Sequence, residues 1–132
     1  MSIQHVRSGS PYEDAYGFSR ALRHGDRVLV AGTAPIPEPG REVAATAYEQ
    51  MLRCGEIAVR ALSEAGAAAA DVVRTRMYIT DAKDADDVGR AHGEVFGAAR
   101  PVATMVVVAG LIDPSWRVEI EVEAVLRPRP AG

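Results

Sequence analysis

The sequence is poor in the residues that mark several common classes of protein. It contains a single cysteine, Cys54, so the chain forms no internal disulfide and holds no cysteine cluster for zinc. Cys54 falls within a helical pattern, where we expect a small buried hydrophobe. The three histidines, His5, His24 and His92, are far apart and lack neighbours at the spacing of metal ligands. We therefore expect neither a metal nor another cofactor.

Basic charge, aromatic residues and long apolar runs are also scarce. The formal net charge is −3 and only 5% of the residues are aromatic, so a nucleic-acid-binding surface is not expected. No window approaches the roughly 18 consecutive apolar residues of a membrane span. The opening residues, MSIQHVRSGS, lack the apolar core of a secretory signal peptide. These absences predict a cytoplasmic protein that binds neither membranes nor nucleic acid.

The residues that are present predict one α+β domain spanning residues 1–132. The length of 132 residues and the 48% hydrophobic content suit a single core. Apolar positions that recur every three or four residues predict helices, and alternating positions predict strands. The expected elements are a hairpin over residues 16–23 and 26–34, a helix over 42–65, a strand from Val72, a helix over 84–96, and strands over 102–109 and 117–126.

Two helices cannot cover both faces of such a sheet. The element order favours a single mixed sheet of about six strands with both helices on one face. The strand after Val72 carries substantial side chains on both sides, which is typical of an interior strand. The uncovered face would carry valines and charged pairs, and we expect it to be buried in a homo-oligomer.

The last strand places three carboxylates, Glu119, Glu121 and Glu123, on one side, because successive strand residues point to opposite faces. Two hypotheses remain open for this row. In one, arginines of neighbouring segments neutralise the carboxylates in a structural charge ladder. In the other, one glutamate is partly desolvated in a cleft and activates water or carries a proton. The arginines available for the ladder are Arg74, Arg76 and Arg117.

Several segments, taken in order, resemble the Rid (RidA/YjgF) family of enamine and imine deaminases. They are YGFSRAL, VLVAGTAP, MLRCGEIAVRALSEAGA, VVRTRMYITD, HGEVFG, RPVATMVVVAGL and VEIEVEAV. The resemblance implies a chorismate-mutase-like α+β fold assembled as a homotrimer, with clefts between the subunits that bind a small molecule. It also implies hydrolysis of reactive 2-enamine or 2-imine acids to 2-keto acids and ammonia.

The resemblance also assigns roles to individual residues. Glu119 falls on the family's water-activating glutamate, and Gly32 on the glycine whose backbone lines the cleft. Ala103 stands where the family has the arginine that grips the substrate carboxylate. Arg100, three residues earlier, is a candidate replacement, although an odd offset in a regular strand points to the opposite face.

Other family positions are also changed, and most changes remove a hydrogen-bonding group. Phe18 replaces a tyrosine, Thr33 a glutamine, Gly89 an asparagine and Met105 a small residue. These substitutions predict a less polar cleft in which Phe18, Thr33 and Met105 contact the ligand. Two functions stay open: hydrolysis of an enamine or imine with Glu119 activating water, or a non-catalytic trimer that binds a ligand or another protein.

Overall fold

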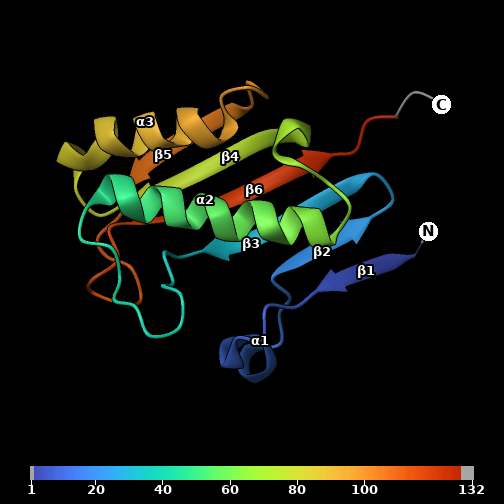
Figure 1. Cartoon of the computed structure of the whole chain (residues 1–132), viewed down its shortest axis with the longest axis horizontal. Helices are drawn as coiled ribbons and strands as arrows, with labels where there is room; N and C mark the ends of the chain where they lie inside the picture. The colour runs from blue at the N-terminus through green and yellow to red at the C-terminus, as the bar shows by residue number, and fades with distance from the viewer. Residues whose placement is uncertain (1, 129–132) are drawn as a thin grey trace.

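The structure, a computed structural model, describes residues 2–128 and contains one six-stranded sheet with two long helices (Figure 1). The strands are β1 (Ile3–Val6), β2 (Ala21–His24), β3 (Arg27–Thr33), β4 (Val72–Ile79), β5 (Val102–Val107) and β6 (Val118–Val125). The α-helices are α1 (Pro11–Tyr16), α2 (Ala47–Glu64) and α3 (Ala85–Phe96), and short 3-10 turns span Ala69–Asp71 and Ala82–Asp84.

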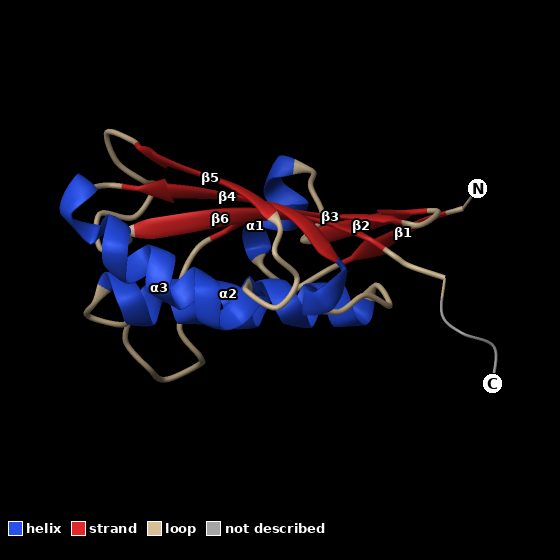
Figure 2. Cartoon of the chain, turned by 90° about the horizontal axis from the view of Figure 1, so that it is seen from above, coloured by secondary structure: helices blue, strands red, loops and turns tan. Residues whose placement is uncertain are grey.

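The sheet is mixed, with the strand order β1-β2-β3-β6-β4-β5. Strands β4 and β5 run parallel, and every other neighbouring pair is antiparallel. Helices α2 and α3 lie side by side on one face, while the opposite face has no long helix over it (Figure 2). The predicted α+β class, the six strands and the placement of both helices on one face are therefore confirmed.

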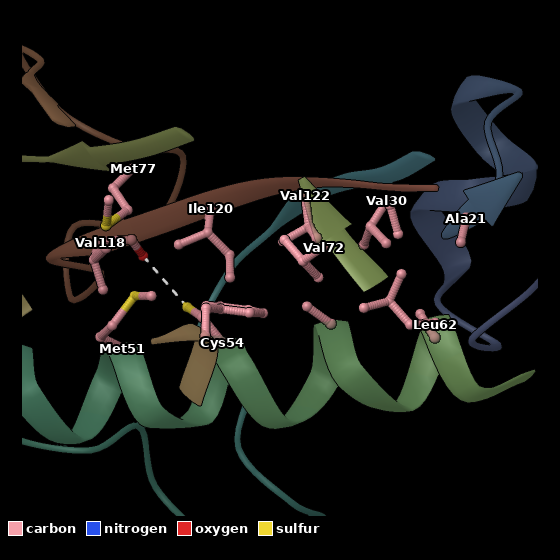
Figure 3. Packing of buried hydrophobic residues seen from close by; sticks show 14 of the residues in the cluster. Ala21, Val30, Met51, Cys54, Leu62, Val72, Met77, Val118, Ile120 and Val122 are labelled. Atoms are coloured by element: carbon pink, nitrogen blue, oxygen red, sulfur yellow. Dashed lines mark hydrogen bonds between the residues drawn. The ribbon is translucent and has the colours of Figure 1, made fainter. Parts of the chain in front are cut away.

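The core fills the layer between the sheet and these helices. Strand β6 points Val118, Ile120 and Val122 at α2, which meets them with Met51 and Cys54 (Figure 3). Burial raises the pKa of the Cys54 thiol, and its Sγ lies 3.9 Å from the carbonyl oxygen of Val118. The prediction of a small buried hydrophobe at this position is confirmed.

Helix α2 begins five residues later than predicted. Thr46 has an extended backbone and its hydroxyl accepts a hydrogen bond from the backbone N–H of Glu49, which makes it the N-cap. Residues 42–46 therefore belong to the preceding loop, although their alanines continue the helical pattern. The predicted stop at Gly66 is confirmed, since Gly66 has a φ of +87° just beyond the helix.

Two short elements near the N-terminus escaped prediction. Strand β1 supplies the sixth strand at the sheet edge, and three of its four residues are exposed. Helix α1 begins after Ser10, with Pro11 in its first turn, and ends at Gly17 in the left-handed conformation. It includes Tyr16, so the predicted strand over residues 16–23 is wrong at its start and the hairpin begins at Ala21.

Within the described residues, no helix is both long enough and apolar enough to cross a membrane.

Candidate functional site

The candidate site lies on the sheet face that α2 and α3 leave uncovered, here called the open face. Because Val118 and Ile120 point into the core, Glu119 between them points to the open face. In the sheet register Glu119 lies opposite Tyr78 of β4, and Tyr78 lies opposite Val106 of β5. Glu119 thus stands near the start of β6, beside the bulge that interrupts the pairing of β3 and β6.

The three carboxylates of β6 differ in their partners. Glu123 forms an ion pair with Arg74, at 3.2 Å between Oε2 and Nε, and Glu121 accepts a hydrogen bond from the Tyr78 hydroxyl. Across residues 2–128, no donor hydrogen-bonds to Glu119, and no cationic nitrogen lies within 4.0 Å of its carboxylate. The charge-ladder hypothesis is thus confirmed at Glu123 and fails at Glu119.

The other two arginines of the proposed ladder behave differently. Arg76 is the register partner of Glu121, but the two charges form no ion pair within 4.0 Å among the described residues. Arg117 lies against Asp84, with 3.3 Å between Nη1 and Oδ1. The prediction that Arg117 neutralises the row is therefore wrong, because the chain has not yet entered the strand there and its side chain meets the turn before α3.

Gly32 lies directly under the Glu119 carboxylate. A Cβ atom placed on Gly32 would come within 2.6 Å of Oε2 of Glu119. Only glycine leaves this space free, so the carboxylate rests against the bare backbone of the β3 bulge. The structure therefore brings together two of the residues that the sequence predicted for the site.

A residue that sequence analysis missed, Arg20, completes this cluster. Its Nη2 donates to the carbonyl oxygen of Gly32 at 2.8 Å, and its Nη1 donates to Oγ1 of Thr33 at 3.4 Å. Arg20 precedes β2, two residues after Phe18, and its guanidinium carbon lies 5.9 Å from the centre of the Phe18 ring. The one sequence signal for Arg20 is its two-residue spacing from Phe18 in YGFSRAL, and it is weak because both residues precede β2, which begins at Ala21.

Burial and charge act in opposite directions on Glu119. Burial raises the pKa of the Glu119 carboxyl group, the positive charge of Arg20 lowers it, and the neighbouring charge of Glu121 raises it. The net shift is upward, so the protonated form of Glu119 is favoured more than in an ordinary carboxyl group. Among the described residues, no three His, Cys, Asp or Glu side chains gather as a metal site would require.

Phe18 and Thr33 occupy different positions at the site. Phe18 is 40% exposed on the open face. Thr33 is fully buried, and its hydroxyl donates to the carbonyl oxygen of Ala31 at 2.8 Å while accepting from Arg20. Thr33 therefore orients Arg20 and presents no surface of its own to a ligand within the chain, which corrects the expectation of direct contact in a single subunit.

Met105 lies on the other side of the sheet from Glu119. It is the register partner of Met77, whose side chain is in the core, and it packs against that core. Ala103 is likewise the partner of buried Thr75, whose hydroxyl lies 2.7 Å from Nε2 of His92. Within one chain, the structure does not bring Met105 or the Ala103 position to Glu119.

Arg100 is also remote from Glu119 in the same chain. In the sheet register, Glu119 lies level with Val106 of β5. Strand β5 begins at Val102, which is four residues, or about 13 Å, from Val106 along the strand. Arg100 precedes Val102 still further from that level, and it is exposed with a φ of 54°. It cannot stand in for the missing arginine inside one subunit.

A groove of about 470 Å³ runs along the open face beside this cluster. It is lined by Phe18 and Leu29 on one side and by Arg76, Glu121 and Glu123 on the other. Glu119 and Gly32 do not line the groove. Phe18 connects the two regions, because it lines the groove and also lies beside Arg20.

The comparison with known proteins agrees with this architecture. Residues 10–126 match the family model described as Endoribonuclease L-PSP. An uncharacterized protein of Streptomyces coelicolor is 43% identical over 123 residues, which cover 93% of this chain and 92% of the relative. A RutC family protein of Pyrococcus abyssi is 36% identical over 109 residues, covering 82% of this chain and 84% of the relative.

Solved structures show the same fold. Rv2704 of Mycobacterium tuberculosis, described as a member of the YjgF/YER057c/UK114 family, superimposes with a TM-score of 0.87 at 42% identity. The match covers 95% of this chain and 100% of Rv2704. A putative endoribonuclease of Thermotoga maritima gives a TM-score of 0.79 at 29% identity, covering 94% of this chain and 93% of its own. The chain is therefore a member of the L-PSP family, which is also the YjgF or Rid family.

Proposed function

We propose that this protein hydrolyses a reactive imine or enamine, with Glu119 as the general base, in clefts between the subunits of a homotrimer. The observation that carries the proposal is the isolation of Glu119. Its carboxylate is partly buried and rests on Gly32, yet no group in residues 2–128 hydrogen-bonds to it or pairs with it. A desolvated carboxylate without a structural partner is the arrangement that a general base requires.

The reaction follows from that position. Ionised Glu119 takes a proton from a water molecule while the water oxygen bonds to the C=N carbon. Glu119 passes that proton to the nitrogen, which completes a neutral carbinolamine. It then transfers the proton of the new hydroxyl group to the amino group as the C–N bond breaks and the C=O bond forms, so that Glu119 ends ionised. One imine and one water yield one carbonyl compound and one ammonia, so no oxidant, reductant or cofactor is consumed. An enamine enters the same route after it tautomerises to the imine.

The trimeric assembly is supported by the composition of the open face. It exposes large apolar side chains on several strands, among them Leu29 at 41% and Val106 at 42%. A surface of this kind is normally covered.

The second candidate is a trimer that binds a ligand or a protein without catalysis. It is favoured by the ion pair of Glu123 with Arg74, which is a structural use of the row, and by Ala103 at the position of the family's arginine. Cleavage of RNA, which the description of the family names, is less well supported. The formal net charge is −3, and three carboxylates crowd the face that would meet the phosphates.

An assay of ammonia release tests the proposal. We expect the purified protein to accelerate the loss of freshly generated 2-iminobutanoate, or of imines with other side chains, with equal amounts of ammonia and carbonyl product. The signal is the rate above the spontaneous reaction, measured in parallel with a single-stranded RNA substrate. Binding of the carbonyl product without acceleration of any imine would favour the non-catalytic trimer, and cleavage of the RNA alone would overturn both.

The close contact at Gly32 gives a second prediction. In Gly32→Ala the new Cβ would displace the Glu119 carboxylate, because the two would otherwise be 2.6 Å apart. A displacement of about 1 Å at a reacting group costs on the order of 100-fold in rate. We therefore expect kcat/KM to fall between about 10- and 100-fold, with little change in the midpoint of thermal unfolding, because a flexible side chain can move aside.

Gly93→Ala is the matched control. Gly93 lies exposed on α3, and a Cβ there would meet nothing within 4 Å. We expect wild-type kinetics for this variant. If Gly32→Ala and Gly93→Ala were equally active, the carboxylate would not need its present position and Glu119 would lose its role as base.

A further inference from the structure

Two pairs of opposite charges face each other across β4 and β6, and only one of them forms an ion pair. Arg74 lies opposite Glu123, and Arg76 lies opposite Glu121. Glu123 pairs straight across with Arg74 at 3.2 Å. Among the described residues, no cationic nitrogen comes within 4.0 Å of the Glu121 carboxylate. The residue types, the strands and the register are alike, so a third group must account for the difference.

That group is the hydroxyl of Tyr78. It donates a hydrogen bond to Oε1 of Glu121. The Glu121 carboxylate is therefore held along the diagonal between the strands instead of straight across from Arg76. The hydrogen bond to Glu121 raises the pKa of Tyr78, which keeps the hydroxyl protonated and able to donate. No hydroxyl of residues 2–128 donates to Glu123, so its ion pair meets no such competitor.

Tyr78 also stands beside the proposed general base. It is the register partner of Glu119, and the side chains of such a pair share one face with Cβ atoms about 4.5–5.5 Å apart. To a lesser extent than the hydrogen bond, the charge of Arg76 lowers the pKa of Tyr78 and the charge of Glu119 raises it. The Tyr78 hydroxyl thus lies within reach of both charges, and it decides where the carboxylate of Glu121 is held.

The balance of charge around Glu119 depends on that placement. The titratable and charged groups around it are Arg20 before β2, Glu121 on β6, Tyr78 and Arg76 on β4, and the buried thiol of Cys54 on α2. Burial raises the pKa of Glu119 most, Arg20 lowers it, and the charge of Glu121 raises it. The contribution of Glu121 persists only while no cation neutralises its carboxylate.

We propose that Tyr78 is a positioning residue for the general base: its hydroxyl holds Glu121 apart from Arg76, so that an uncompensated negative charge remains beside Glu119. This inference rests on the proposed function and deepens it by naming a residue that tunes the base. A nearby negative charge favours the protonated form of a carboxyl group, which makes the ionised form a stronger base. Tyr78 acts on the reaction only through Glu121.

The titration of Glu119 in Tyr78→Phe tests the inference. Phenylalanine keeps the ring beside Glu119 but frees Glu121, which should then pair with Arg76. We expect the pKa of Glu119 to fall, as followed by the NMR signal of its carboxyl carbon, which is assigned by its loss in Glu119→Gln. The acid limb of kcat/KM should move to lower pH in step, while the plateau changes less than about threefold because Glu119 itself is retained.

A double variant distinguishes this role from a general disturbance of the sheet. In Tyr78→Phe combined with Arg76→Gln, no cation remains opposite Glu121 to neutralise it. We therefore expect the pKa of Glu119 to return toward its wild-type value, although two side chains have now been changed instead of one. A merely structural loss would grow with the second substitution, whereas a loss that acts through charge is reversed by it.

Tyr48→Phe is the matched control. The Tyr48 hydroxyl also donates to a glutamate, Glu94, at 2.5 Å, but on the helices instead of the open face. We expect it to leave the titration of Glu119 unchanged. An unchanged or raised pKa of Glu119 in Tyr78→Phe, or a fall that persists in the double variant, would overturn the inference. The carboxyl signal needs no substrate, so these results hold even if the protein hydrolyses no imine, an outcome that would refute the proposed function alone.

Discussion

Glu119→Gln is expected to lower kcat/KM for imine hydrolysis by about 10²–10⁴-fold, the usual contribution of a general base. Glutamine keeps the shape of the side chain and can still fit over Gly32, but it cannot accept a proton from water. Because Glu119 takes no part in a hydrogen bond or an ion pair within residues 2–128, the fold should not depend on its charge. We expect an unchanged or slightly higher midpoint of thermal unfolding.

The pH profile of the wild-type protein checks the same role. A general base works in its ionised form, so kcat/KM should fall as the pH drops through the pKa of Glu119. Burial raises that pKa above the ordinary carboxyl value, and the acid limb should therefore lie at a correspondingly higher pH. In Arg20→Gln the limb should move further upward, because the positive charge that lowers the pKa of Glu119 is gone.

Glu123→Gln provides the matched comparison for Glu119→Gln. Glu123 lies on the same face of the same strand but pairs with Arg74 at 3.2 Å. Its loss should leave kcat/KM within about threefold of the wild-type value, and a partly exposed ion pair contributes at most about 1 kcal/mol to stability. If Glu119→Gln and Glu123→Gln were equally active, both carboxylates of β6 would have only a structural role, and the proposed reaction would be wrong.

Periodicity was sufficient for the parts of this fold that are long and half-buried. The alternation in β6 located its core side and its row of carboxylates, and the three-to-four spacing located α2 and α3 to within a few residues. The elements that escaped are short. Strand β1 is an exposed edge strand of four residues, and α1 has six residues, so neither contains enough positions for a pattern to stand out.

The site was predictable only in part, for a related reason. Resemblance and alternation together led to Glu119 and Gly32, which the structure brings into contact. Alternation cannot say which faces of neighbouring strands coincide, because that depends on the register between strands. The register places Met105 on the core side. Arg20 was missed because its partners, the backbone of Gly32 and the hydroxyl of Thr33, reach it only through tertiary folding.

Gln50 is another residue that no sequence pattern singled out, although it connects three segments near the site. It lies in the first turn of α2 and is only 1% exposed. Its Nε2 donates to the carbonyl oxygens of Ala44 and Ser115, each at 2.9 Å, and its Oε1 accepts from the backbone N–H of Arg117 at 2.7 Å. It thus anchors the loop before α2 and the loop before β6, two residues ahead of Glu119.

Gln50→Leu is expected to destabilise the protein by about 2–3 kcal/mol. The substitution preserves the size of the side chain but removes three part-buried hydrogen bonds to two carbonyl oxygens and one N–H, and each lost bond costs about 0.5–1.5 kcal/mol. Part of that cost is offset by the apolar side chain that replaces the amide. Chemical denaturation, monitored by circular dichroism at one protein concentration, measures the change in the free energy of unfolding.

Gln4→Leu is the control for Gln50→Leu, because Gln4 makes one exposed hydrogen bond where Gln50 makes three. Gln4 lies on β1, and its Nε2 donates to the carbonyl oxygen of Glu64 in an exposed hydrogen bond of 3.0 Å. Water can replace that contact, so Gln4→Leu should cost no more than about 1 kcal/mol. If Gln50→Leu were no more destabilising than Gln4→Leu, the three hydrogen bonds would contribute no net stability. The approach of β6 to the site would then be fixed by its packing against α2 alone.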